Sequence, residues 1–206
     1  MSTRFLLAAL AVAIAPACGS SYNTVPAGDP VGDTVDEGHA NGNSVAAQAF
    51  GELAPDDYMT IIGKTASILA ALNDGEVNAS AFAVQIINDQ GVFEFANDMI
   101  AEHEDANIRL DDVVRIYGVG YLASDTEATL AAEASQDLAT LRATGPGDFD
   151  FQYTQLQVLS HAEAQVLLDQ LASIVGPGEM GDYIASASAK VDAHLSRATN
   201  LLAGFY

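Results

Sequence analysis

Tryptophan is absent from this chain of 206 residues, cysteine occurs once, and only 7 lysines and arginines stand against 28 aspartates and glutamates. A single cysteine excludes a disulfide within the chain. The formal net charge of -21 repels nucleic acid and anionic lipid head groups, and it attracts cations. Because no basic patch can follow a phosphate backbone, we expect no nucleic-acid partner. The simplest interpretation of the charge is a soluble, self-repelling surface.

Apolar runs are short, and the one at the N-terminus predicts export. FLLAALAVAIA follows the cationic MSTR and precedes PAC, which together predict a signal peptide over residues 1–17. The run is too short to span a bilayer comfortably. Cys18 stands where a bacterial lipoprotein carries its lipid, although Ala15 replaces the usual leucine. Simple secretion stays open, but the lone cysteine at this position favours lipidation. We expect the periplasm or outer membrane of a Gram-negative bacterium, with membrane contact only if Cys18 is acylated.

The remaining chain divides at about residue 57. Residues 18–56 are rich in Gly, Asp, Asn, Ser and Pro and lack a sustained apolar period, which predicts an acidic flexible linker. From Tyr58 onward, apolar residues recur three and four apart. This spacing predicts long helices over about 58–87, 92–117, 149–175 and 180–203, and a shorter helix over about 125–143.

The helical pattern predicts one all-α domain over residues 57–206. The shorter helix opens with a capping box, Ser124 and Glu127. Four long helices joined by short turns favour an antiparallel four-helix bundle, in which the shorter helix is a crossover between two hairpins. The abundance of alanine suits helices that pack closely.

Each long helix carries one ionisable residue on its apolar stripe: Glu76, His103, His161 and His194. With turns centred near residues 89 and 177, the two residues of each hairpin lie at equal heights, about 20 and about 25 Å from their turns. Glu76 would then face His103, and His161 would face His194. One interpretation is a buried site of three histidines and one carboxylate for zinc, copper, nickel or iron. The other is a set of buried histidines that hydrogen-bond and specify packing.

Four segments, taken in order, resemble the family catalogued as domain of unknown function 4142. They are DGEVNASAFA (74–83), FEFANDMIAEHEDAN (93–107), FDFQYTQLQVLSH (149–161) and VDAHLSRATNLL (191–202). The resemblance implies a ferritin-like four-helix bundle of the bacterial envelope, often behind a signal peptide, with no established activity. The family's motif positions fall on Glu76, His103, Tyr153, His161 and His194.

Two departures from the family pattern bear on a site. Glu102 replaces the family's aspartate before His103, and Ser160 stands where an acid usually precedes His161, which removes a possible ligand or orienting group. Ferritin-like di-iron sites also need Glu-x-x-His. Here the residues three before the histidines are apolar, so a di-iron oxidase is not expected: Ile100, Val158 and Val191.

No nucleophile elbow and no phosphate-binding glycine loop occurs in the sequence. The sequence therefore favours a non-enzymatic envelope protein with a structural, binding or stress-related role. The alternative is a metal-binding bundle, for sequestration or redox chemistry, that uses Glu76, His103, His161 and His194. Binding of an amphiphile or a partner along an alanine-rich groove stays open as a third possibility.

Overall fold

The computed structural model describes residues 42–54 and 56–206, and this part of the chain contains helices and no strand. The predicted all-α helical bundle is confirmed. No described helix combines the length and the apolar character needed to cross a bilayer. The helices are α1 (Gly42–Leu53), α2 (Tyr58–Ala83), α3 (Gln90–Tyr117), α4 (Asp125–Ala143), α5 (Phe149–Val175) and α6 (Glu179–Ala203).

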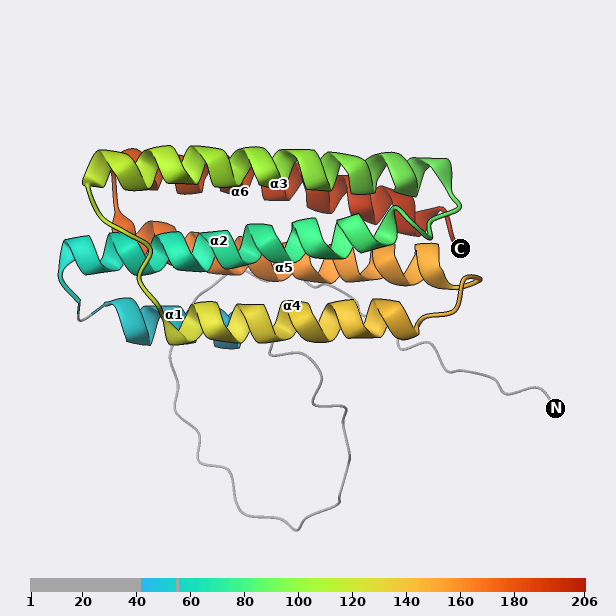
Figure 1. Ribbon diagram of the computed structural model, residues 1–206, viewed down its shortest axis with the longest axis horizontal. Helices are drawn as coiled ribbons and strands as arrows, with labels where there is room; N and C mark the ends of the chain where they lie inside the picture. The colour runs from blue at the N-terminus through green and yellow to red at the C-terminus, as the bar shows by residue number, and fades with distance from the viewer. Residues whose placement is uncertain (1–41, 55) are drawn as a thin grey trace, which may run out of the picture. The chain divides into compact units, whose positions relative to one another are not determined.

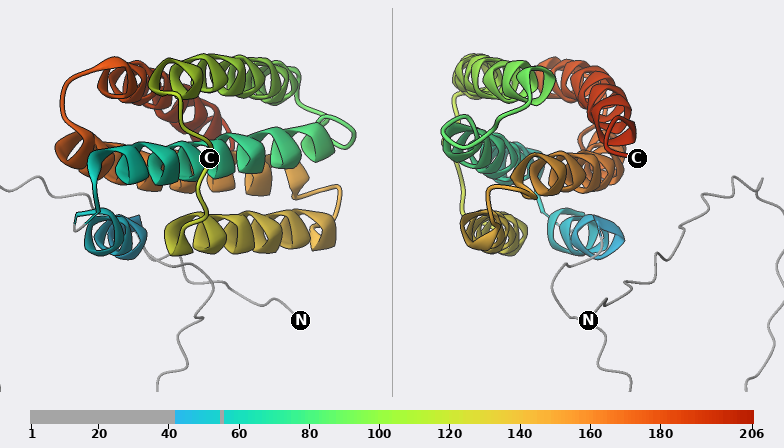
Figure 2. Two further views of the ribbon diagram at one scale, coloured as in Figure 1. Left: turned by 60° about the vertical axis from the view of Figure 1, so that its left-hand side comes forward. Right: turned by 90° about the vertical axis from the view of Figure 1, so that its right-hand side faces the viewer.

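The helices of this domain form three layers of two (Figures 1 and 2). Helices α2 and α5 form the middle layer, with α3 and α6 on one side and α1 and α4 on the other. Two antiparallel hairpins, α2–α3 and α5–α6, make up the four-helix bundle. Helix α4 connects the end of the first hairpin to the start of the second, as the predicted crossover does. It packs mainly against α2.

The predicted linker ends earlier than expected, because helix α1 lies within it. That linker was expected to reach residue 56, but residues 42–53 are helical and pack against α5. The buried residues of α1 follow helical spacing: Val45, Ala46, Ala49 and Leu53. Two of them are alanines, so the apolar stripe is weak in a stretch that also contains glycine and asparagine. The predicted signal peptide and Cys18 lie outside the described residues.

Capping side chains fix where the bundle helices begin. Asp57, Asp89 and Ser124 accept hydrogen bonds from the first backbone N–H groups of α2, α3 and α4. The Ser124 Oγ accepts from the Glu127 N–H at 2.9 Å, so this half of the predicted capping box forms. The Asp150 carboxylate at the start of α5 accepts from the N–H groups of Asn88 and Asp89. This contact ties the α2–α3 turn to α5 and helps to set the relative height of the hairpins.

Gly63 allows the chain to cross α2 on its way to α4. The Leu122 N–H donates to the Gly63 carbonyl at 3.1 Å. A Cβ atom at residue 63 would lie 2.7 Å from the Leu122 Cγ and 2.9 Å from the Gly120 carbonyl oxygen. A side chain at this position would therefore push the crossing loop away from the bundle.

The interior contains two hydrophobic clusters with a polar layer between them. The first includes Leu69, Leu110 and Val191, and the second includes Ala79, Met99 and Ala198. On α2, α3 and α6 the two clusters are separated by several residues. The candidate site residues lie in those intervals, in the middle of the bundle: Asn73, Glu76, His103 and His194.

Candidate metal centre

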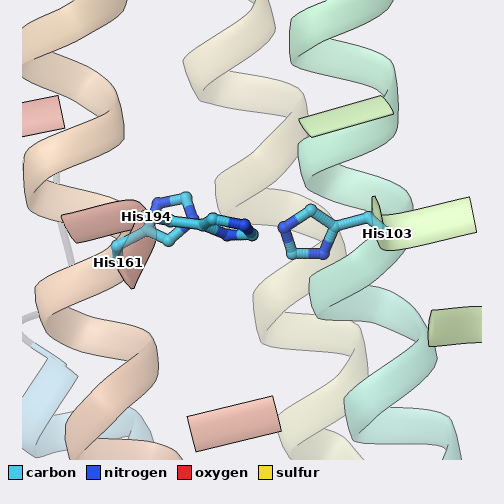
Figure 3. Close-up of side chains that lie close together, drawn as sticks. All are labelled: His103, His161 and His194. Carbon is cyan, nitrogen blue, oxygen red and sulfur yellow. The ribbon is translucent and has the colours of Figure 1, made fainter. Parts of the chain in front are cut away.

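Three of the four residues predicted for a metal site come together. His103 on α3, His161 on α5 and His194 on α6 are buried, and one ring nitrogen from each lies within 4.8 Å of the others. The ring centroids are 5.3 Å apart for His161 and His194, 5.5 Å for His103 and His194, and 6.1 Å for His103 and His161. Figure 3 shows the rings of His161 and His194 beside each other and facing the ring of His103. The two hairpins are therefore in register at this level.

A chain of amides fixes the orientation of His103. The Asp74 carboxylate accepts from the Asn107 Nδ2, and the Asn107 Oδ1 accepts from the Asn73 Nδ2, both at 2.8 Å. The Asn73 Oδ1 is then left to accept from the His103 Nδ1 at 3.0 Å. Because Nδ1 carries the proton, the neutral ring has its lone pair on Nε2. That Nε2 is buried and has no hydrogen-bond partner.

His161 and His194 each donate one ring N–H to an acceptor outside the cluster. The His161 Nδ1 lies 2.9 Å from the Gln157 carbonyl oxygen, and the His194 Nε2 lies 3.2 Å from the Glu102 Oε2. Both partners can only accept, so the neutral rings have lone pairs on the His161 Nε2 and the His194 Nδ1. These two atoms are 3.3 Å apart. Two lone pairs at this distance repel each other unless a proton or a metal ion lies between them.

Glu76, the fourth predicted ligand, is outside the three-histidine cluster. It lies on the far side of His161, with its Oε1 3.9 Å from the Nδ1 of that ring. Its carboxylate accepts from the Gln157 Nε2 and the Ser160 Oγ, both at 2.8 Å. Glu76 thus supports the segment of α5 that holds His161. Ser160 helps to orient this carboxylate, although the sequence predicted that an orienting group was lost there.

The predicted pairing of Glu76 with His103 needs a correction of one turn. The direct partner of His103 is Asn73, three residues before Glu76. The prediction placed the hairpin centre between residues 89 and 90 and assumed regular helix up to the turn. Helix α2 ends at Ala83, and the chain then passes through turns before α3 begins at Gln90. The midpoint between the two helices therefore comes earlier in the chain than predicted, and this shifts the register.

Burial lowers the pKa of two of the three histidines, His103 and His194. Desolvation lowers the pKa of His103 to about 4, with a smaller contribution from the neighbouring histidines. Desolvation and the proximity of His161 also lower the pKa of His194. The hydrogen bond from Lys190, followed by that from His194, lowers the pKa of Glu102. Burial alone would raise the pKa of Glu76, but His161, His103 and the two hydrogen bonds together bring it below its ordinary value. Neutral imidazoles beside ionised carboxylates suit a bound cation.

Tyr153, the remaining family-motif position, packs in the hydrophobic interior next to the site. It is fully buried on α5, two turns before His161, and its hydroxyl lies 2.8 Å from the Ser80 Oγ. Its ring packs edge-on against Phe95. Tyr153 therefore belongs to the adjacent hydrophobic cluster and does not reach the histidines.

Sequence reasoning missed the residues that orient the histidines. Asn73 is a polar residue buried three positions before Glu76, whereas His161 donates to the backbone carbonyl of Gln157, which a residue of any type would supply. The spacing of Asn73 from Glu76 was a usable signal. Glu102 precedes His103 but supports His194 on another helix, a contact that depends on how α3 packs against α6.

The comparison with protein families agrees with this architecture. The model of the family described as "Domain of unknown function (DUF4142)" matches residues 53–201, which is well over half of the chain. The chain belongs to the DUF4142 family. The DUF4142 match covers the crossover helix α4, almost all of the four-helix bundle and the three histidines, and it begins at the last residue of α1. No curated protein and no solved structure matches the chain. The description of the family assigns no activity to the matched residues.

Proposed function

We propose that the protein binds one divalent transition-metal ion through the Nε2 of His103, the Nε2 of His161 and the Nδ1 of His194. One observation carries this proposal. Each of the three rings donates its outer N–H to an acceptor, so the inner nitrogens of all three rings present lone pairs. Oriented histidines of this kind are a usual feature of metal centres.

The spacing of the inner nitrogens fits a metal ion. Two nitrogens bound at about 2.05 Å to one tetrahedral ion lie about 3.3 Å apart. The His161 Nε2 and the His194 Nδ1 are separated by 3.3 Å. His103 completes the set from the opposite side: its ring nitrogen lies within 4.8 Å of the other two, and binding draws it closer to them.

Packing alone is the competing interpretation, and His103 argues against it. A buried nitrogen that accepts no hydrogen bond costs free energy, about 1–3 kcal/mol. The Nε2 of His103 is such an atom. In a core that used these rings only for packing this lone pair stays unsatisfied, whereas a metal ion would satisfy it.

The three imidazole ligands limit which metals the site suits and which role the protein has. Imidazole suits zinc, copper, nickel and iron, and the absence of a carboxylate ligand distinguishes the site from a di-iron centre. Glu76 and Glu102 hold neighbouring residues and compensate charge. We assign the protein to the sequestration or transfer of a metal ion, aided by an acidic surface that attracts cations.

The test is the metal content of the full chain after exposure to zinc, copper, nickel or iron and removal of excess. We expect about one ion per chain for at least one metal. His103→Ala should lose the ion, while Leu110→Ala should retain it. Leu110 is fully buried on the same helix, in a hydrophobic cluster away from the rings, so this variant controls for lost stability. Less than about 0.1 ion per wild-type chain with every metal would refute the proposal.

We also propose that the bundle is exported and anchored by a lipid on Cys18, in the periplasm or outer membrane of a Gram-negative bacterium. The support is the cationic segment, the apolar run and the lone cysteine that follows it. Mass spectrometry of the mature N-terminus should find Cys18 acylated. A cleaved chain with an unmodified cysteine would show simple secretion instead.

A further inference from the structure

A cavity of about 310 Å³ extends from the three histidines to the surface between α3 and α6. Its volume is far above the ~15 Å³ that a single water needs. The wall is mainly apolar, with Leu72, Leu168 and Val191 among its residues. The cavity therefore brings an apolar space to the side chains of the candidate centre.

The fourth bundle helix, α2, gives the centre no ligand. The Asn73 Oδ1 is engaged with His103, and the Glu76 carboxylate is engaged with Gln157 and Ser160. Three imidazoles thus leave at least one coordination position of a tetrahedral ion for a ligand from outside the protein. Since the cavity is lined by all three histidines, that position faces the cavity.

Formal charge favours an anion as the outside ligand. A divalent ion contributes +2, Glu76 and Glu102 contribute -1 each, and Lys190, bonded to Glu102, contributes +1. The total is +1, which one monovalent anion would neutralise; an unbalanced buried charge is costly.

Arg109 adds a second positive charge at the cavity mouth. Among the described residues it forms no ion pair; its guanidinium donates to the Ser186 Oγ and lies 5.9 Å from the centre of the Tyr183 ring. The exposed Asp105 also lines the cavity and offsets this charge, so the net positive charge of the loaded site comes from the metal ion.

We propose that the cavity binds a small organic carboxylate, whose oxygen occupies the remaining metal position and whose short apolar chain lies against Leu72, Leu168 and Val191. This inference rests on the proposed metal site. The apolar wall favours a carboxylate over hydroxide or an inorganic anion, because either of these would leave most of the apolar space unused.

The experiment uses the full chain loaded with Co²⁺, whose visible absorption responds to its ligands. Metal content is measured first, so that failure to bind metal is separated from failure to bind a carboxylate. A chain that binds no cobalt overturns this inference, and one that also binds no zinc, copper, nickel or iron overturns the metal site as well. Acetate and hexanoate are then titrated in a carboxylate-free buffer. We expect both to change the spectrum, and hexanoate to bind at least about 20-fold more tightly, because each buried methylene contributes ~4-fold.

Two variants test whether hexanoate binds in the cavity. Ala187→Phe fills the cavity, and Ala185→Phe places the same side chain on the exposed face of α6. Ala187→Phe should keep its cobalt and lose the preference for hexanoate, whereas Ala185→Phe should keep both. If Ala187→Phe fails to fold, Ala106→Leu on α3 serves the same purpose. Cobalt-loaded protein that ignores both acids, binds them equally, or retains the preference in the filled cavity would overturn this inference and leave the metal site standing.

Discussion

The His161 Nε2 and the His194 Nδ1 face each other at 3.3 Å, and the opposite nitrogen of each ring already donates to an oxygen. The two rings come from antiparallel helices joined by a tight turn, so their heights are fixed by α5 and α6. A third ring, His103, approaches from the other hairpin. The contact between two acceptor nitrogens explains why the centre of this bundle is suited to a cation.

Asn73→Ala should weaken metal binding about 10–100-fold, because His103 would lose the acceptor that holds its proton on Nδ1. Asn78→Ala is the matched control, since Asn78 is exposed on the same helix. Competition titration with a coloured chelator measures both affinities. Equal affinities for the two variants would show that the amide chain does not orient His103 for binding.

Glu76→Gln tests whether Glu76 binds the metal directly or only supports His161. Glu76 contacts Gln157 and Ser160 and lies behind His161, so we expect metal affinity to fall only about tenfold and one ion per chain still to bind. His161→Ala should abolish binding under the same conditions. A complete loss of metal from a folded Glu76→Gln protein, measured by elemental analysis, would make the carboxylate a direct ligand.

The stability of the metal-free protein should fall as the pH is lowered from about 6.5 to about 4. The pKa of His103 is about 4 in the folded protein, against 6.5 for an ordinary histidine. Between these values the unfolded chain takes up a proton and the folded chain does not, so protonation favours unfolding. This group alone should lower the free energy of unfolding by about 2 kcal/mol between pH 7.5 and 5.0.

Several groups around His103 contribute to the same pH profile. Glu76 and Glu102 favour its protonation, whereas His161 and His194 oppose it. Urea unfolding of the chelator-treated chain measures the effect, and His103→Gln should reduce it. If the free energy of unfolding is the same at both pH values, the ring is not held neutral by burial.

Leu53→Ala should lower the free energy of unfolding by about 2–5 kcal/mol, because Leu53 is fully buried in the hydrophobic core beside α5. Phe50→Ala is the control on the same helix, since half of that side chain is exposed, and it should change stability little. Chemical denaturation compares the two. A silent Leu53→Ala variant would favour the flexible linker that the sequence predicted.

The long helices and their polar positions could be predicted because the apolar spacing is regular from Tyr58 onward. Ionisable residues on an apolar stripe are conspicuous, and this pattern singled out His103, His161 and His194 together with Glu76, which lies outside the cluster. The convergence of the three histidines could not be predicted, since it depends on the relative height of two hairpins. The structure fixes that height through contacts such as the Asp150 carboxylate on the α2–α3 turn.

Two features escaped sequence reasoning for physical reasons. The buried face of α1 contains two alanines, whose weak apolar signal is hidden by neighbouring glycine and asparagine. The partner of His103 was displaced by one turn, because turns that end a helix early change the register. Both errors concern local geometry that hydrophobic periodicity does not record.

X-ray absorption spectroscopy of the zinc-loaded full chain tests the central claim most directly. We predict three imidazole nitrogens at about 2.0 Å and one further light donor in the first coordination shell. A shell with no more than one imidazole, or one composed of carboxylate and water oxygens, would contradict the three-histidine site.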